Sequence, residues 1–366
     1  MITYIDKVNN FIESFNPKTG FYIRSGVIQN GADTGVDPFM RDFPQLIDIG
    51  IMGQCAHGSE GLCNKAGIQC YQNGDHVIKN NMSVKDYISI IQQCSGKVFQ
   101  VALGGRGDVD QHEHLQQILS ITRDHGIVPN FTTSGYNFTR KIADMCNEYV
   151  GAIAVSWYRA PHTIKAIDTL LTVGIKTNIH YVLGKNSIDE AIYLLKSNLL
   201  PHEINAIIFL LHKPVGQGKE SNVLHCKDDR VIQFFKIIDN IQSKYKIGFD
   251  SCTIPGLITL TSNIDFTGID YCEGARFSCY IDAQMNIMPC SFAQNNYWSI
   301  SLNKKSIEEA WNSEKFNQFR QIIYNSCSKC LDRLLCGGGC PIINQITLCD
   351  RKERHYENTS GFCYKQ

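Results

Sequence analysis

Between residues 46 and 260 the chain alternates apolar runs with amphipathic segments, and this alternation limits the possible folds more than any other feature. Each apolar run has the length of a buried strand, and the runs cover residues 46–53, 99–105, 128–135, 151–158, 176–184 and 204–214. Segments with helical periodicity follow them, at 84–94, 112–126, 139–149, 161–174, 187–198 and 228–245. Continuous apolar strands joined by helices predict a parallel sheet with a covered outer face. Six units are fewer than the eight of a closed barrel, so an incomplete barrel and a doubly wound sheet both fit.

The alternation stops near residue 260. Short β-like pieces within 277–290, one helix over 306–323 and a cysteine-dense tail follow. This part has too few apolar positions to form a large hydrophobic core, so we expect bound metal clusters to crosslink and stabilise it. We therefore expect three parts: an N-terminal segment (1–45) with a short helix and a hairpin, a barrel (46–260), and a cysteine-rich domain (261–366).

Composition excludes several classes of protein. Lys+Arg and Asp+Glu are both 35, which argues against a strongly basic nucleic-acid surface. No run approaches the roughly 18 apolar residues of a membrane span. The first residues, MITYIDKVNNFIESF, lack the charged start and apolar centre of a signal peptide. We expect a cytoplasmic protein with no membrane or nucleic-acid partner.

Sixteen cysteines are unevenly distributed along the chain. In a reducing compartment, thiols more often bind metal or take part in chemistry than form disulfides. Four scattered ones, Cys94, Cys146, Cys226 and Cys252, are expected to be small buried hydrophobes. Three others directly follow the first expected strand, where parallel α/β folds carry their sites, and nine lie between 272 and 363. We expect the clustered ones to be metal ligands.

The densest run is CSKCLDRLLCGGGC, with Cys327, Cys330, Cys336 and Cys340. Thiolates at this spacing, with glycines that let the backbone fold closely, suit zinc or iron–sulfur ligation. On this run alone, both metals remain open.

The loop after the first expected strand resembles the cluster-binding loop of radical S-adenosylmethionine (SAM) enzymes. In CNKAGIQCYQNG, Cys63 and Cys70 keep the spacing of the family's outer cysteines, and Tyr71 is the usual aromatic residue after the last one. Gly67 stands at the middle position, so we assign the third thiolate to Cys55. The resemblance implies a [4Fe–4S] cluster with one open iron for SAM, whose one-electron cleavage gives a 5′-deoxyadenosyl radical.

Further stretches resemble SAM-contacting segments of that family. ALGGRGD resembles the glycine-rich motif, with Gly104 and Gly105 near the methionine amine and its acidic residue displaced to Asp108. The same resemblance implies contacts from residues at the ends of three later strands: Ser134, Ser156, and the backbone of Val182 and Leu183.

The tail resembles a SPASM domain, a two-cluster extension of radical SAM peptide-modifying enzymes. The resemblance implies an auxiliary cluster near the active site on Cys272, Cys290 and Cys340, with Cys279 as the candidate fourth ligand. It implies a distal cluster on Cys327, Cys330 and Cys336, completed by Cys363, with Cys349 as competitor. Three [4Fe–4S] clusters are therefore expected. Met285 replaces the usual turn glycine before the PC pair.

The resemblance also implies a substrate class: a peptide or protein, most often a ribosomally made precursor that undergoes crosslinking, epimerisation or backbone excision. The alternatives are a small molecule such as a carbohydrate or alcohol, and a non-catalytic zinc or iron–sulfur protein. Reduced flavodoxin or ferredoxin would supply electrons. The 45 residues before the first expected strand are too few for the family's winged-helix domain, so a separate recognition protein or the N-terminal segment would bind a leader peptide. No catalytic residue is assigned; Cys252 is the unassigned thiol best placed to donate hydrogen.

Overall fold

The predicted strands form one sheet in the computed structural model, which describes residues 1–58, 60–74, 76–197, 199–201 and 203–350. The sheet has the order β12-β11-β10-β9-β8-β7-β6-β13-β14-β15. Its six predicted strands are β6 (Leu46–Met52), β7 (Gln100–Gly105), β8 (Val128–Thr133), β9 (Ile153–Ser156), β10 (Thr177–Leu183) and β11 (Ala206–Leu211). They are parallel, and β12 (Lys246–Phe249) adds a seventh. The helix predicted to run to residue 245 ends at Asn240, and a connection of five residues separates it from β12.

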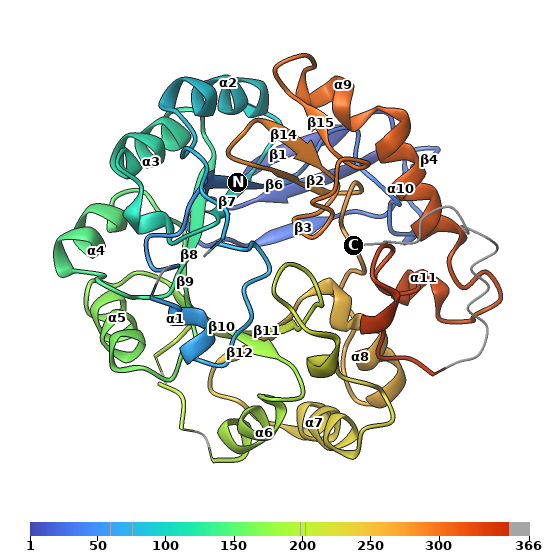
Figure 1. Cartoon of the computed structure of the whole chain (residues 1–366). Coiled ribbons are helices and arrows are strands. Elements are labelled where there is room, and N and C mark those ends of the chain that lie inside the picture. Colours follow the sequence, from blue (N-terminus) through green and yellow to red (C-terminus); the bar gives the residue numbers. More distant parts are fainter. Residues whose placement is uncertain (59, 75, 198, 202, 351–366) are drawn as a thin grey trace.

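Six helices connect these strands and form an arc around them (Figure 1). They are α2 (Val84–Cys94), α3 (Leu115–Asp124), α4 (Arg140–Asn147), α5 (Pro161–Thr172), α6 (Ile188–Ser197) and α7 (Asp229–Asn240). The side chains of Ser83, Thr139 and Asp228 accept backbone N–H groups at the first turns of α2, α4 and α7. Local sequence therefore fixes where several of these helices begin.

The barrel is incomplete, as predicted. Strand β13 (Ser278–Ile281), from the C-terminal part, pairs with β6 in parallel and continues into β14 (Asn286–Met288) and β15 (Ile300–Ser301). A cavity of about 800 Å³ lies between β12 and the segment before β13, lined by Phe249, Asp270 and Glu273 among others. At the β13–β14 turn Met285 adopts a φ of 62°, a left-handed conformation that glycine adopts more readily.

The C-terminal part adds α8 (Ile254–Leu260), α9 (Ile307–Trp311), α10 (Glu314–Asn325) and α11 (Arg333–Cys336) on the side of the barrel opposite α4 and α5 (Figure 1). The prediction of one helix over 306–323 is wrong: the chain breaks at residues 312 and 313. Ser313 accepts the backbone N–H of Phe316 and begins a new helix. An internal capping residue therefore split the predicted helix.

The N-terminal segment is built of strands, so the predicted helix is wrong. Strands β1 (Ile2–Asp6), β2 (Phe11–Phe15) and β3 (Tyr22–Arg24) form an antiparallel sheet, and β4 (Ile28–Gln29) and β5 (Ala32–Asp33) form a hairpin. Burial alternates along β2 with the period of a strand. Phe15 stacks on Phe99 with ring centroids 5.4 Å apart, and both pack with Val128. The sheet therefore covers the amino ends of β7 and β8.

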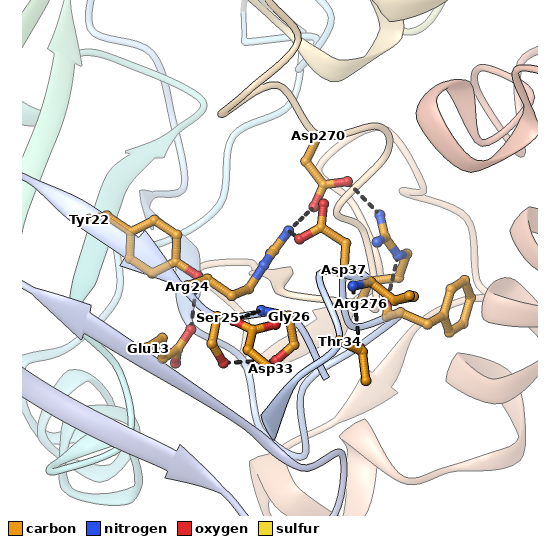
Figure 2. Close-up of polar contacts among 12 residues, drawn as sticks. Glu13, Tyr22, Arg24, Ser25, Gly26, Asp33, Thr34, Asp37, Asp270 and Arg276 are labelled. Carbon is orange, nitrogen blue, oxygen red and sulfur yellow. Dashed lines mark hydrogen bonds and ion pairs between the residues drawn. The ribbon is translucent and has the colours of Figure 1, made fainter. Parts of the chain in front are cut away.

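A polar network ties this segment to the C-terminal part (Figure 2). Arg24 donates to Asp37 at 3.2 Å and to Asp270 at 3.1 Å, and Arg276 reaches the other oxygen of Asp270 at 3.2 Å. Asp270 and Arg276 lie in the segment that leads into β13. The first and last thirds of the chain are thus joined directly.

Candidate metal centres at the barrel mouth

Half-buried polar side chains line the inner face of the barrel. Along β6, Ile47 and Ile49 are fully buried, whereas Asp48 between them keeps access to the interior. The parallel register pairs Asp48 with Ala102 and Ala102 with Asn130, so their side chains share this face. His180 on β10 lies there as well, where its ring is 3.3 Å from the hydroxyl of Thr132. Desolvation raises the pKa of Asp48 to about 6 and lowers that of His180 to about 4.

The cysteine-rich loop follows β6 at the carboxyl ends of the strands, which we call the barrel mouth. Cys63 lies in the short helix α1 (Leu62–Lys65), and its sulfur is 3.0 Å from the hydroxyl of Tyr158. Burial raises the pKa of Cys63 to about 12, and the neighbouring Cys70 and Cys55 add to the rise. The structure therefore brings together the three thiols predicted for the first cluster.

The donor set consists of three cysteine thiols, which are the usual protein ligands of iron–sulfur clusters. A four-iron cluster offers each thiolate its own iron, so its ligands need to be neighbours without meeting at a point. Thiolates that face one another are mutually unfavourable unless metal compensates their charge. The donor set therefore fits an iron–sulfur cluster.

Two glycines let neighbouring loops approach Cys55. A Cβ on Gly107 would lie 2.6 Å from the carbonyl oxygen of Gln54 and 3.0 Å from Cα of Cys55. A Cβ on Gly74 would lie 2.6 Å from the carbonyl oxygen of Arg106. The loop after β7 therefore packs directly on the cysteine loop and fixes its path over the barrel mouth.

The predicted glycine pair of the SAM site serves two different purposes. A Cβ on Gly104 would meet nothing within 4 Å, so this residue borders open space. Gly105 has a φ of 119°, and a Cβ there would lie 2.4 Å from the carbonyl oxygen of Met52. Gly104 keeps the place expected of a ligand contact, whereas Gly105 is required for packing between β7 and β6.

Ser134 is directed at Asp108. Its hydroxyl and its backbone N–H donate to the two carboxylate oxygens of Asp108, at 2.5 and 2.8 Å. Asp108 also lies 3.4 Å from His57, and a hydrogen bond to this carboxylate raises the pKa of His57. The displaced acidic residue is thus held beside the cysteine loop.

The remaining predicted SAM contacts divide between the two faces of the sheet. Ser156 ends β9, pairs with His180 and is half-buried, as is Val182 on the same inner face. The side chain of Leu183 is 1% exposed and belongs to the core under the helices. Its carbonyl accepts the backbone N–H of His212. The side chain of Leu183 therefore points away from the interior.

Tyr71 connects the first thiol group with a second one. Its ring packs on Phe292 with centroids 4.7 Å apart, and the backbone N–H of Phe292 donates to the sulfur of Cys290 at 3.5 Å. The ammonium of Lys213, just past β11, lies 4.4 Å from the centre of the Phe292 ring. The loops that carry Cys70 and Cys290 therefore meet at the barrel mouth.

The second group holds four thiols. Burial raises the pKa of Cys290 to about 12, with a contribution from Cys252. Burial also raises the pKa of Cys272, and the nearby thiols of Cys290 and Cys252 raise it further. A hydrogen bond with the Cys340 thiol is the main reason for the raised pKa of Cys252, followed by burial. Three members were predicted as ligands; Cys252 was predicted from sequence only as a buried thiol or a hydrogen donor.

Cys279, the candidate fourth ligand, lies elsewhere. Its thiol is 2% exposed on β13, where burial and then the nearby Cys94 of α2 raise its pKa. The structure does not bring it to the other three predicted ligands of this cluster, because its position in β13 directs it toward the covering helices.

A third group forms around the run from Cys327. Burial raises the pKa of Cys336 to about 11, and Cys349, Cys327 and Cys330 add to the rise. Gly337, Gly338 and Gly339 all have positive φ, a turn that separates Cys336 from Cys340, which belongs to the second group. Cys349, the predicted competitor, is thus near this group, and Cys363 lies outside the described residues.

The chain is similar to known proteins in its C-terminal domain and in its fold. The model of the SPASM family, an iron–sulfur cluster-binding domain, matches residues 272–331. The fold is similar to that of Streptococcus suis SuiB bound to S-adenosylmethionine, with 17% identity, a TM-score of 0.64, and 85% of this chain and 77% of that chain covered. A second SuiB structure, bound to the precursor peptide SuiA, has 16% identity, a TM-score of 0.62, and 85% and 76% covered. Native anSMEcpe with bound AdoMet has 14% identity, a TM-score of 0.58, and 81% and 89% covered.

These matches confirm the predicted incomplete barrel with its C-terminal SPASM domain. A search of curated proteins finds no significant match. Within the described ranges, no helix has the length and apolar character needed to cross a bilayer.

Proposed function

We propose that this chain, which has a SPASM domain and the fold of SuiB and anSMEcpe, is a radical SAM enzyme that modifies a peptide. The observation that carries the proposal is the meeting of two thiol groups at one barrel mouth, through the packing of Tyr71 on Phe292. One group follows the first barrel strand, and the other includes Cys272 and Cys290 of the SPASM match.

In this proposal, Cys55, Cys63 and Cys70 hold the first cluster. When bound, it would supply the electron that cleaves SAM to a 5′-deoxyadenosyl radical, which abstracts hydrogen from the substrate. Gly104 leaves room for the cofactor, and Ser134 holds Asp108 beside the loop. Asp48 and His180 would orient polar groups inside the barrel, where water is largely displaced.

A peptide is the proposed substrate because two structures of similar fold were solved with peptides: SuiB with SuiA, and anSMEcpe with Cp18Cys peptide. The N-terminal sheet covers the amino ends of the barrel strands, away from the barrel mouth. This placement favours a separate protein for leader-peptide recognition. The proposed electron donor is reduced flavodoxin or ferredoxin.

The direct test is anaerobic reconstitution followed by metal analysis and incubation with SAM and reductant. We expect about twelve irons per chain, for three four-iron clusters, and reductant-dependent release of 5′-deoxyadenosine. The C63A variant should lose that release and keep the iron of the other two groups. Colourless protein that binds only zinc, or brown protein that leaves SAM intact, would contradict the proposal.

The substrate class has its own test. Short open reading frames adjacent to the gene would be co-expressed with the enzyme, and the peptides would be analysed by mass spectrometry. A mass change that requires the enzyme and is absent with C63A would support a peptide substrate. No change in any adjacent peptide, together with turnover of a carbohydrate or alcohol, would refute it.

A further inference from the structure

The geometry points to Cys252, in place of Cys279, as the fourth thiolate beside Cys272, Cys290 and Cys340. This assignment rests on the proposed function only in taking the four-thiol group to be a cluster site. Such a site would be completed by a residue from the barrel and not by a residue of the SPASM domain.

The position of Cys252 is fixed by the end of the last barrel strand. It lies in the turn Ser251–Thr253, directly after β12. Asp250 anchors that turn, since its backbone N–H donates to Phe209 and its carboxylate accepts the hydroxyl of Thr253 at 2.7 Å. The loop that carries Cys340 packs on the segment that follows this turn, since a Cβ on Gly339 would lie 3.3 Å from the Pro255 side chain. The thiol of Cys252 is therefore close to that of Cys340, and the thiols of Cys272 and Cys290 are among its neighbours.

The register of β13 directs the side chain of Cys279 to the outer face of the sheet, away from the four-thiol group. Cys279 pairs with Ile47 of β6, and Tyr280 pairs with Asp48. Directly paired residues of neighbouring strands share a face. Ile47 is fully buried under the helices, so Cys279 is directed to the outer face, where its neighbours include Cys94 and Arg320. Moving Cys279 to the other thiols would require a one-residue slip of β13, which would reverse every side chain of the strand.

A buried positive charge accompanies the four thiols. The side chain of Lys213 is 3% exposed, and its ammonium contacts Asp250 at 2.5 Å. It also lies near the thiols of Cys252, Cys340 and Cys290. A lysine side chain is rarely buried unless nearby negative charge compensates its ammonium group. One carboxylate together with cluster thiolates provides that charge.

The assignment has a chemical consequence. With four cysteine thiolates, each iron of this cluster has a protein ligand, and none is open to hold a substrate thiolate. Cys252 is also then unavailable as a hydrogen donor. The cluster would accept or pass electrons at the barrel mouth without binding the substrate.

The test uses the full-length C55A/C63A/C70A variant, which lacks the proposed SAM cluster, so that only the auxiliary clusters are observed. In this background C252S is compared with C279S by iron content and by electron paramagnetic resonance (EPR) of the reduced protein. We expect C252S to change one cluster signal or to lose up to half of about eight irons per chain. We expect C279S to match the parent. Added cyanide, a ligand for an open iron, should shift the signal of C252A and leave the parent unchanged.

Three results would overturn the assignment: C279S losing a cluster, C252S keeping the parent spectrum and iron, or cyanide shifting the parent signal. Should C279S fail to fold because its site is fully buried, C252S and the cyanide experiment still decide. Absence of 5′-deoxyadenosine formation by the unvaried chain would contradict the proposed function alone and leave the ligand assignment intact.

Discussion

The ammonium of Lys213 is a buried positive charge beside the thiols of the proposed auxiliary cluster. Burial acts to lower its pKa, but Asp250 and the thiols of Cys252 and Cys340 raise it above its ordinary value. Lys213 therefore stays protonated. A fixed positive charge stabilises the more negative, reduced state of a nearby cluster, and charges around the sulfurs are a main determinant of cluster potential. This residue is consequently expected to raise the reduction potential of the cluster.

At this scale we predict that K213M lowers the potential of one auxiliary cluster by roughly 60 mV or more, the one-electron equivalent of about 1.4 kcal/mol. D250N removes the opposing charge and should raise it. An EPR-monitored redox titration of the reconstituted protein measures both. The control is K219M, which removes an exposed lysine of the same loop. Equal potentials in K213M, D250N and the unvaried protein would contradict the prediction.

At the scale of elements, the cysteine loop depends on its neighbours for its shape. Its short helix α1 has no buried residue, so its own hydrophobic contacts do little to fix it. The loop is held instead by close backbone contacts at Gly107 and Gly74, and by Arg159, which donates to the carbonyl of Ala66 at 2.8 Å. Ligand geometry is therefore set by loops that follow β7 and β9.

We predict that G107A loses about four irons per chain, those of the first cluster, because its methyl group would displace the backbone at Cys55. Overpacking of this kind costs about 1–3 kcal/mol. G104A is the matched variant: its methyl group enters open space, so it should keep its iron and bind SAM several-fold more weakly. Iron analysis and SAM binding measure the two effects. Full iron and undiminished 5′-deoxyadenosine release by G107A would contradict this account.

Elements with strong periodicity could be predicted from the sequence, whereas elements set by tertiary contacts could not. The six strand–helix units have long apolar runs and are present. β12 is short and directly follows a long helical pattern, so it was not among the six predicted strands. The pattern of β2 fits either period, and its packing on Phe99 decides for a strand.

The same distinction applies to the site. The resemblance of a local motif indicated Cys63 and Cys70, and Cys55 was assigned as the nearby replacement for the cysteine that is absent at Gly67. Ser187 and Glu190, before and within α6, have the sequence spacing of a capping box, yet Ser187 donates to the carbonyl of Val182 and Glu190 accepts the hydroxyl of Tyr181. The proximity of Cys252 to Cys340 depends on how β12 and α8 meet the C-terminal loop, which local sequence does not encode.

At the scale of the whole molecule, the N-terminal sheet and the C-terminal part enclose the barrel from two sides. Arg24 and Asp270 join them with side chains that are 12% and 17% exposed, and Arg276 beside them is 1% exposed. Removing Arg24 takes one of two cationic partners from the largely buried carboxylate of Asp270. The network should therefore stabilise the packing of the N-terminal sheet against the C-terminal part of the chain.

We predict that R24M lowers the free energy of unfolding by about 2 kcal/mol, whereas R140M changes it by less than about 0.5 kcal/mol. Arg140 pairs with Asp144 on an exposed helix surface, which makes it a suitable control. Thermal unfolding of both anaerobically prepared variants gives the comparison. Equal losses in R24M and R140M would show that the network contributes no more than a surface pair.

The pairing of β6 with β13 has a consequence for biosynthesis. The first barrel strand cannot complete its hydrogen bonds on one edge until the last third of the chain has left the ribosome, since the whole barrel lies between these partners in the sequence. Contacts so distant in sequence form slowly, and an open strand edge invites pairing with other chains. The nascent protein thus passes through a stage in which β6 has one unpaired edge, and any metal inserted before release would enter an incomplete barrel.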